Sequence, residues 1–306
     1  MFALAGVASV SVARAVVEAP LVEAASRGDV AAVRAALEAG ADADQRQGDG
    51  ATGLHWAVHR GDLTLVEMLL AAGATVDAVN DLAVTPLLLA ASSGQVAVVD
   101  RLLAAGADPE GGGADRERPL MRAAWVGSVD VVRSLLDAGA DPNGVEPARR
   151  QTALMWAVAE RHPHVVRLLL DRGAAVDAAT VTHRTGRAAT RDIVGYTPLL
   201  FAARVGDAES LELLLSAGAD PNAASSDGMS ALILATVRGY PDVAIRLLDA
   251  DADPNAAGPG YAALHWAAGW WETTLTTTDF DRSTGPLGFI QPPPEFHAME
   301  SHRHLH

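Results

Sequence analysis

The sequence repeats itself with a period of about 33 residues, and this period constrains the fold more than any other feature. A Gly-Ala-Asp string or a close variant recurs along the chain, with steps of 33, 33, 33, 34 and 45 residues between its glycines. The last step is one period plus an insertion of 12 residues. These glycines are Gly40, Gly73, Gly106, Gly139, Gly173 and Gly218. A second landmark keeps the same register, at Leu54, Leu87, Leu120, Leu154, Leu199, Leu232 and Leu264. Two landmarks in register predict an array of equivalent structural units.

Each unit carries the signals of two short helices. In Thr85-Pro86-Leu87 the threonine is suited to cap a helix, and proline is suited to the first helical position. A glycine such as Gly94 then ends this helix. The following segment has apolar residues at helical spacing, and the glycine of Gly-Ala-Asp ends it in turn. Each unit is therefore predicted to be a helix-turn-helix followed by a loop that leads to the next unit.

These motifs resemble the ankyrin repeat family. The resemblance lies in Leu54-His55-Trp56-Ala57, Thr197-Pro198-Leu199 and the repeated Gly-Ala-Asp-Pro-Asn, and it covers residues 18–268. It implies an all-α solenoid of about eight helix-turn-helix units, with short β-hairpin-like fingers on one side. It also implies that the concave surface, formed by the fingers and the first helices, binds a protein or peptide partner. Residues 179–194 are predicted to hold the 12-residue insertion.

The two ends of the chain do not follow the repeat. Residues 1–17 are predicted to be a secretory signal peptide, because an apolar stretch precedes Ala13-Arg14-Ala15, a small-x-small cleavage site. The alternative is an N-terminal helix packed on the first repeat. Residues 269–306 are predicted to be an irregular tail or a truncated repeat, in which Trp270-Trp271 and a threonine-rich stretch replace the second helix. Export would place the protein in the periplasm or outside the cell, with the cytoplasm as the alternative.

Composition excludes several classes of function. The formal charge is −15, with 23 basic and 38 acidic residues, so binding of nucleic acid is not expected. All basic residues are arginine, which excludes lysine-dependent chemistry, and the absence of cysteine excludes disulfides and thiolate metal sites. No apolar run approaches the roughly 18 residues needed to span a bilayer.

No residue cluster predicts catalysis, so the chain is interpreted as a non-enzyme with no cofactor. His55 and His265 stand where the resembling family places a structural histidine, and His162 and His164 are interpreted as a solvated turn. The histidines of the tail could chelate a metal, but no metal site is predicted.

Two residue sets exceed what the repeat itself requires, and both are predicted to bind the partner. One is a row of large side chains two residues after each motif leucine, which should point toward the concave side, together with Trp125 one turn further along. The other is a group of arginines in three successive finger loops, predicted to form one positive strip for an acidic segment. The alternative is that these arginines pair with Asp115, Glu117, Glu146 or Asp192. The predicted binding residues are Trp56, Trp125, Trp156, Phe201, Trp266, Arg116, Arg118, Arg122, Arg149, Arg150, Arg184, Arg187 and Arg191.

The sequence thus predicts a monomeric, non-catalytic scaffold that binds a protein or peptide on its concave face. The alternative is a regulatory or binding portion of a larger enzyme or transport system.

Overall fold

The computed structural model describes residues 20–113, 117–181, 195–258 and 262–263, and this part of the chain contains seven consecutive helix pairs. The first helices of the pairs are α1 (Pro20–Arg27), α3 (Gly53–His59), α5 (Pro86–Ser92), α7 (Pro119–Val126), α9 (Ala153–Ala159), α11 (Pro198–Val205) and α13 (Ala231–Arg238). The second helices are α2 (Val30–Glu38), α4 (Leu63–Ala71), α6 (Val96–Ala104), α8 (Val129–Asp137), α10 (Pro163–Asp171), α12 (Ala208–Ser216) and α14 (Pro241–Asp249). Within the described ranges the protein is therefore an all-α repeat array, as predicted.

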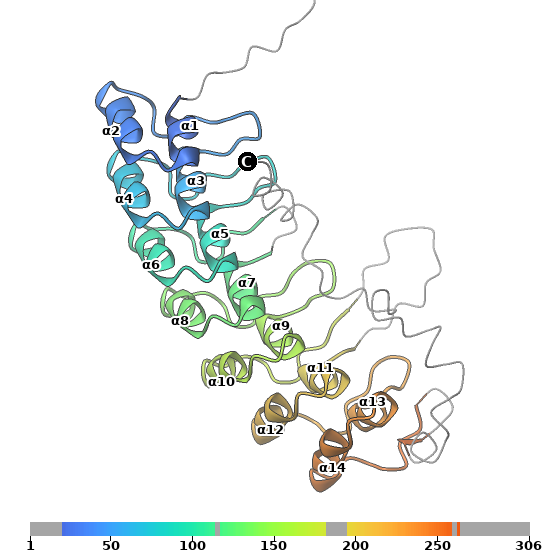
Figure 1. Cartoon of the computed structure of the whole chain (residues 1–306). Coiled ribbons are helices and arrows are strands. Elements are labelled where there is room, and N and C mark those ends of the chain that lie inside the picture. The colour runs from blue at the N-terminus through green and yellow to red at the C-terminus, as the bar shows by residue number, and fades with distance from the viewer. Residues whose placement is uncertain (1–19, 114–116, 182–194, 259–261, 264–306) are drawn as a thin grey trace, which may run out of the picture.

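The pairs stack into a curved solenoid with two helical layers. Each first helix packs on its own second helix and on the first helix of the next repeat, and the second helices form a parallel outer layer. Figure 1 shows the loops projecting from the first-helix side, toward which the stack curves. The concave side is therefore made of first helices and finger loops.

The first helices begin at the residues that the sequence indicates. The hydroxyl oxygen of Thr85 accepts a hydrogen bond from the Leu88 backbone N–H at 3.2 Å, and that of Thr197 accepts one from Leu200 at 3.4 Å. At the start of α7 the chain has Arg118 instead, and this side chain makes no capping bond. The fold tolerates the exception because Pro119 still occupies the first turn.

The first helices supply most of the contact between repeats, and the second helices add a smaller set of buried contacts. Leu135 and Leu169 are both fully buried, as their spacing predicts. Aspartates that precede these helices cap them: Asp29 accepts from Ala32 N at 2.9 Å and Asp62 from Leu65 N at 3.1 Å. The helix-ending glycines have positive φ, and Asp251 takes this role with φ 64°. Asp251 thus has the left-handed backbone that the end of a second helix requires, and Arg161, with φ 61°, has it after the first helix α9.

A ladder of polar side chains joins the turn of each repeat to the next. The carboxylate of Asp44 accepts the Thr75 backbone N–H at 2.7 Å, and Asn143 accepts that of Ala175 at 2.6 Å. The remaining rungs run from Asp77 to Asp108, Glu110 to Asp141, Asp177 to Asp220 and Asn222 to Asp253. These residues come from the Gly-Ala-Asp turns, so the recurring acidic residues serve the fold.

The fingers contain isolated antiparallel bridges rather than extended strands, for example Arg46 with Thr52. The finger between α10 and α11 is closed at its base. There the Thr180 backbone N–H donates to Tyr196 O at 3.0 Å, and the Gly195 N–H donates to Thr180 O at 2.8 Å. The predicted insertion therefore starts and ends at a hydrogen-bonded neck, although residues 182–194 themselves lie outside the described part.

The ends of the chain are largely outside the described residues. Of the predicted eighth unit, the bridge between Ala257 and Ala262 is described, and the chain from residue 264 onward is not. The predicted signal segment and the histidine-bearing tail lie outside as well. No described helix is long and apolar enough to cross a membrane.

Candidate functional site

The row of side chains on the concave side is exposed at some positions and buried at others. Trp56, Trp125 and Trp156 are half-buried, so each residue is partly exposed, as predicted. Phe201 is only 1% exposed and Arg122 only 3%. Both residues were predicted to bind the partner, but their side chains are covered: Arg122 contacts Ser92 of the preceding repeat, and Phe201 contacts Tyr196 and Arg204.

Arg122 is the centre of a polar cluster on α7. Its Nε donates to Ser92 Oγ of the preceding repeat at 3.2 Å, and Nη1 lies 3.7 Å from Glu117 Oε2. The guanidinium carbon lies 5.1 Å from the centre of the Trp125 ring, within the range of a cation–π contact. Burial lowers the pKa of Arg122, and the carboxylate of Glu117 opposes this shift. Arg122 thus contacts both Trp125 and the preceding repeat, and little of its side chain is left exposed.

A second cluster of similar chemistry lies on α11. Phe201 contacts Tyr196 edge-on, with ring centres 5.7 Å apart, and the Arg204 guanidinium lies 5.9 Å from the Phe201 ring. Burial raises the pKa of Tyr196 to about 12, so this phenol stays protonated at physiological pH, and burial lowers the pKa of Arg204. This part of the concave side is therefore a packed core rather than an open surface.

Trp56 and Trp156 occupy equivalent positions but have different polar surroundings. The Trp56 indole Nε1 donates to Gln47 Oε1 at 3.1 Å, and its ring meets His59 edge-on at 5.8 Å. The Nε1 of Trp156 is buried and has no hydrogen-bond partner among the described residues. A buried donor without an acceptor costs about 1–3 kcal/mol. The indole N–H of Trp56 is therefore satisfied within the protein, whereas that of Trp156 is not.

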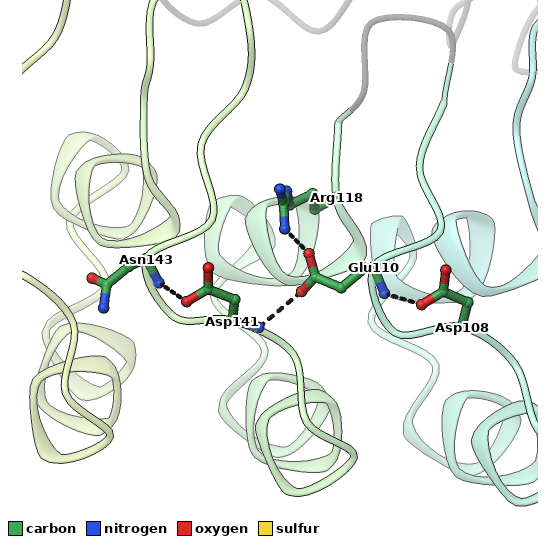
Figure 2. A network of polar contacts seen from close by, with 5 residues as sticks. All are labelled: Asp108, Glu110, Arg118, Asp141 and Asn143. Atoms are coloured by element: carbon green, nitrogen blue, oxygen red, sulfur yellow. Dashed lines mark hydrogen bonds and ion pairs between the residues drawn. The ribbon is translucent and has the colours of Figure 1, made fainter.

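Among the finger arginines, Arg118 is engaged within the protein (Figure 2). It pairs with Glu110 on the opposite side of the same finger, and Glu110 also accepts the Asp141 backbone N–H at 2.8 Å. A side-chain carbon at Gly144 would lie only 2.8 Å from Arg118 Nη1, so the glycine leaves room for the guanidinium against the next finger. Arg118 therefore fits the alternative of internal pairing, although its partner is Glu110 and not one of the predicted acidic residues.

Arg149 and Arg150 lie at the tip of the following finger. Arg150 is exposed, with a positive φ of 56°, and Arg149 is half-buried. Glu146, predicted as an ion-pair partner, instead accepts the backbone N–H groups of Ala148 and Arg149, each at 2.6 Å. This carboxylate therefore shapes the finger backbone. The other predicted binding residues, Trp266, Arg116, Arg184, Arg187 and Arg191, lie outside the described residues, as do Asp115 and Asp192.

The two described histidines of interest have structural contacts. Thr52 N donates to His55 Nδ1 at 3.2 Å, and His55 Nε2 lies 3.0 Å from the Val84 carbonyl oxygen of the next repeat. Since a backbone N–H can only donate and a carbonyl only accept, His55 is the neutral tautomer protonated on Nε2. Burial lowers the pKa of His55, in keeping with this role. His162 is half-buried and its Nε2 contacts the Trp125 carbonyl oxygen at 3.0 Å, so the prediction of a solvated turn is wrong there.

Sequence reasoning missed the aspartate caps and the inter-repeat ladder as structural devices, although their regular recurrence was the available signal. Within the described residues, no three acidic or histidine side chains gather in a way that could hold a metal ion.

Comparison with known protein families identifies the class that this fold defines. A family model of ankyrin repeats matches residues 21–112, 81–146, 120–225 and 199–270. Together these matches span most of the chain, which therefore belongs to the ankyrin repeat family.

Relatives resemble parts of the chain. An ankyrin repeat-containing protein of Treponema pallidum (strain Nichols) is 41% identical over 103 residues, which is 34% of this chain and 30% of that protein. Glycerophosphocholine phosphodiesterase gde1 of Schizosaccharomyces pombe is 34% identical over 101 residues, 33% of this chain and 8% of that enzyme. The chain thus spans less than a third of each of these relatives. The crystal structure of the human ASB11 ankyrin repeat domain matches with a TM-score of 0.64 and 28% identity, over 77% of this chain and 99% of that domain.

Proposed function

We propose that the protein is a non-catalytic scaffold that binds a protein or peptide partner on its concave face. Ankyrin repeats generally mediate protein–protein interaction, and this fold is typically non-catalytic. The observation that carries the proposal is the group of half-buried tryptophans, Trp56, Trp125 and Trp156, on one side of the array. Aromatic rings bury a large area at low entropic cost, which makes them frequent anchors of interfaces.

The partner is proposed to offer an acidic segment to the arginine-bearing fingers. Since Arg118 is already paired with Glu110, the proposed strip consists of Arg116, Arg149 and Arg150 together with the arginines of residues 182–194. Guanidinium groups bind carboxylates through paired hydrogen bonds. Nucleic acid is disfavoured as the partner by the charge of −15 on the whole chain.

A salt titration tests this proposal. A partner captured from native cell extract should bind more weakly as salt rises, and the Arg184/Arg187/Arg191→Ala variant should lose most of that dependence. The matched control is Arg34/Arg133/Arg167→Ala, which removes the same charge from exposed positions on the second helices and should leave the salt dependence unchanged. Binding that ignores salt, and that is unaffected by the first variant, would remove the fingers from the recognition surface.

A second candidate is a binding portion of a larger enzyme or transport system. The similarity to a short part of gde1, itself named as an enzyme, favours this alternative. An intact reading frame downstream of residue 306 that encodes a catalytic or transport domain would support it. A stop codon at that point would count against it.

We further propose that the protein is exported and that cleavage after Ala15 leaves Val16 at the mature N-terminus. The apolar run before Ala13-Arg14-Ala15 supports this proposal. N-terminal sequencing of protein produced in a secretion-competent host tests it. An intact Met1 on a cytoplasmic product would contradict it.

A further inference from the structure

The last described helix has an apolar surface where the other second helices have charge. Ile245 on α14 is 55% exposed and Leu248 is 44% exposed. In every other described second helix, the position equivalent to Ile245 is charged and exposed. These residues are Arg34, Glu67, Asp100, Arg133, Arg167 and Glu212. We refer to Ile245 and Leu248 as the α14 end patch.

This patch points toward the place where a further repeat would stack. Glu212, the equivalent of Ile245 in the preceding repeat, forms an ion pair with Arg246 of α14. A side chain at this position, although exposed, can therefore reach the second helix of the next repeat. The equivalents of Leu248 are also leucines, at 37, 70, 103, 136, 170 and 215, and all of them are half-buried, whereas Leu248 is exposed. Figure 1 shows α13 and α14 as the last labelled helices at this end of the stack.

We infer that the α14 end patch is the docking site of the chain's own segment 269–290, anchored by Trp270 and Trp271. The terminal unit of a repeat array requires a polar outer face, and Ile245 and Leu248 make part of the α14 surface apolar instead. The family match ends at residue 270, immediately before the threonine-rich stretch of residues 273–278. Threonine is a poor helix former, so a regular second helix is disfavoured there. The same segment supplies apolar side chains at Trp270, Trp271, Leu275 and Phe280.

Size and connectivity favour this occupant over a second copy of the chain. A stable interface between two proteins buries about 800 Å² on each partner, and two aliphatic side chains provide only a small fraction of that area. A tethered segment binds at high effective concentration and avoids the translational cost of association. The segment also begins a few residues after Ala263, the last described residue of the array.

Because the chain has no cysteine, thiol labelling provides a direct test. In the full-length protein, Ile245→Cys should react with a maleimide at least about tenfold more slowly than Arg167→Cys, the equivalent position on α10. A tenfold difference corresponds to about 1.4 kcal/mol in favour of the covered state. Adding Trp270→Ala and Trp271→Ala should restore rapid labelling at position 245. The control pair His302→Ala and His304→Ala, further along the tail, should not.

Each other outcome overturns the inference. Equal labelling rates for Ile245→Cys and Arg167→Cys would show that the patch is open. Protection that disappears on dilution would indicate a second copy, and protection that survives the tryptophan substitutions would indicate another cover. Far-UV circular dichroism confirms that the array is folded in each variant, and Trp271→Ala alone is the milder version if the double variant unfolds. The measurement needs no partner, so its result is independent of the proposed function.

Discussion

The second helices and the first helices of this array differ in how much the residue at an equivalent position varies between repeats. In the second helices, the third residue before the helix-ending glycine is leucine in all seven described repeats, with Asp251 in place of the glycine in the seventh. In the first helices, the position two residues after the motif leucine is Trp56, Leu89, Arg122, Trp156, Phe201 or Leu234. Packing between the second helices keeps the same side chain at this position in every repeat, whereas the position on the concave side holds side chains of different size and charge. The variable positions are therefore where recognition can be encoded, provided that the side chain is exposed.

Phe201 gives the strongest test of this difference between the two layers. It occupies one of the variable first-helix positions, but its side chain is buried. Phe201→Ala should lower the free energy of unfolding by roughly 3–5 kcal/mol, as expected when a buried aromatic ring is removed. Chemical denaturation monitored by circular dichroism measures the change. A loss of partner binding at unchanged stability would instead place Phe201 in the interface.

Leu135 tests the outer layer directly. Leu135→Ala should cost roughly 2–5 kcal/mol, because the side chain is fully buried between α8 and its neighbours. Arg133→Ala on the exposed face of the same helix is the control and should change stability by less than about 0.5 kcal/mol. A change below about 0.5 kcal/mol for Leu135→Ala in urea melts would contradict the assigned packing.

Trp156 tests the concave side. Trp156→Ala should weaken binding of the captured partner by roughly 1–3 kcal/mol while the helical signal is retained. The half-buried ring favours a role in contact with the partner. Isothermal titration calorimetry gives the affinity. A parallel loss of affinity and of thermal stability would show that the tryptophan only fills the groove between first helices.

His55 should make the second repeat sensitive to acid, with a smaller effect than the substitutions above. Its pKa is lowered in the folded state, so the unfolded chain binds the proton more readily. Stability is therefore complete above the ordinary histidine pKa of about 6.5 and falls as the pH drops below it. Urea melts at pH 7.5 and pH 5.5 measure this difference, and His55→Gln should reduce it. An unchanged pH dependence in the variant would exclude His55 as the source.

The fold was predictable because its signals are local and repeated. The caps at Thr85 and Thr197 and the positive φ of Gly94 and Asp251 depend on residues within one turn. The candidate site was predictable only in part, because exposure depends on neighbours from other repeats. Arg122 is covered by the contact with Ser92, 30 residues away, and Arg118 is paired with Glu110 across its finger. The first contact depends on how neighbouring repeats stack, and the second depends on how the finger loop folds back on itself, and neither is visible in the repeat pattern.

Hydrogen bonds between Thr180 and Tyr196 close the base of the finger between α10 and α11. The length of this finger can therefore change without disturbing the packing of the repeats. Because its two ends are already held together, a longer or shorter segment placed there changes the closure entropy only slowly, by about 0.6 kcal/mol for each doubling of length. The ladder rung from Asp177 to Asp220 crosses this interval and keeps the repeats in register. This junction is therefore a ready-made grafting site, where a foreign peptide epitope could be displayed beside the concave surface without redesign of the scaffold.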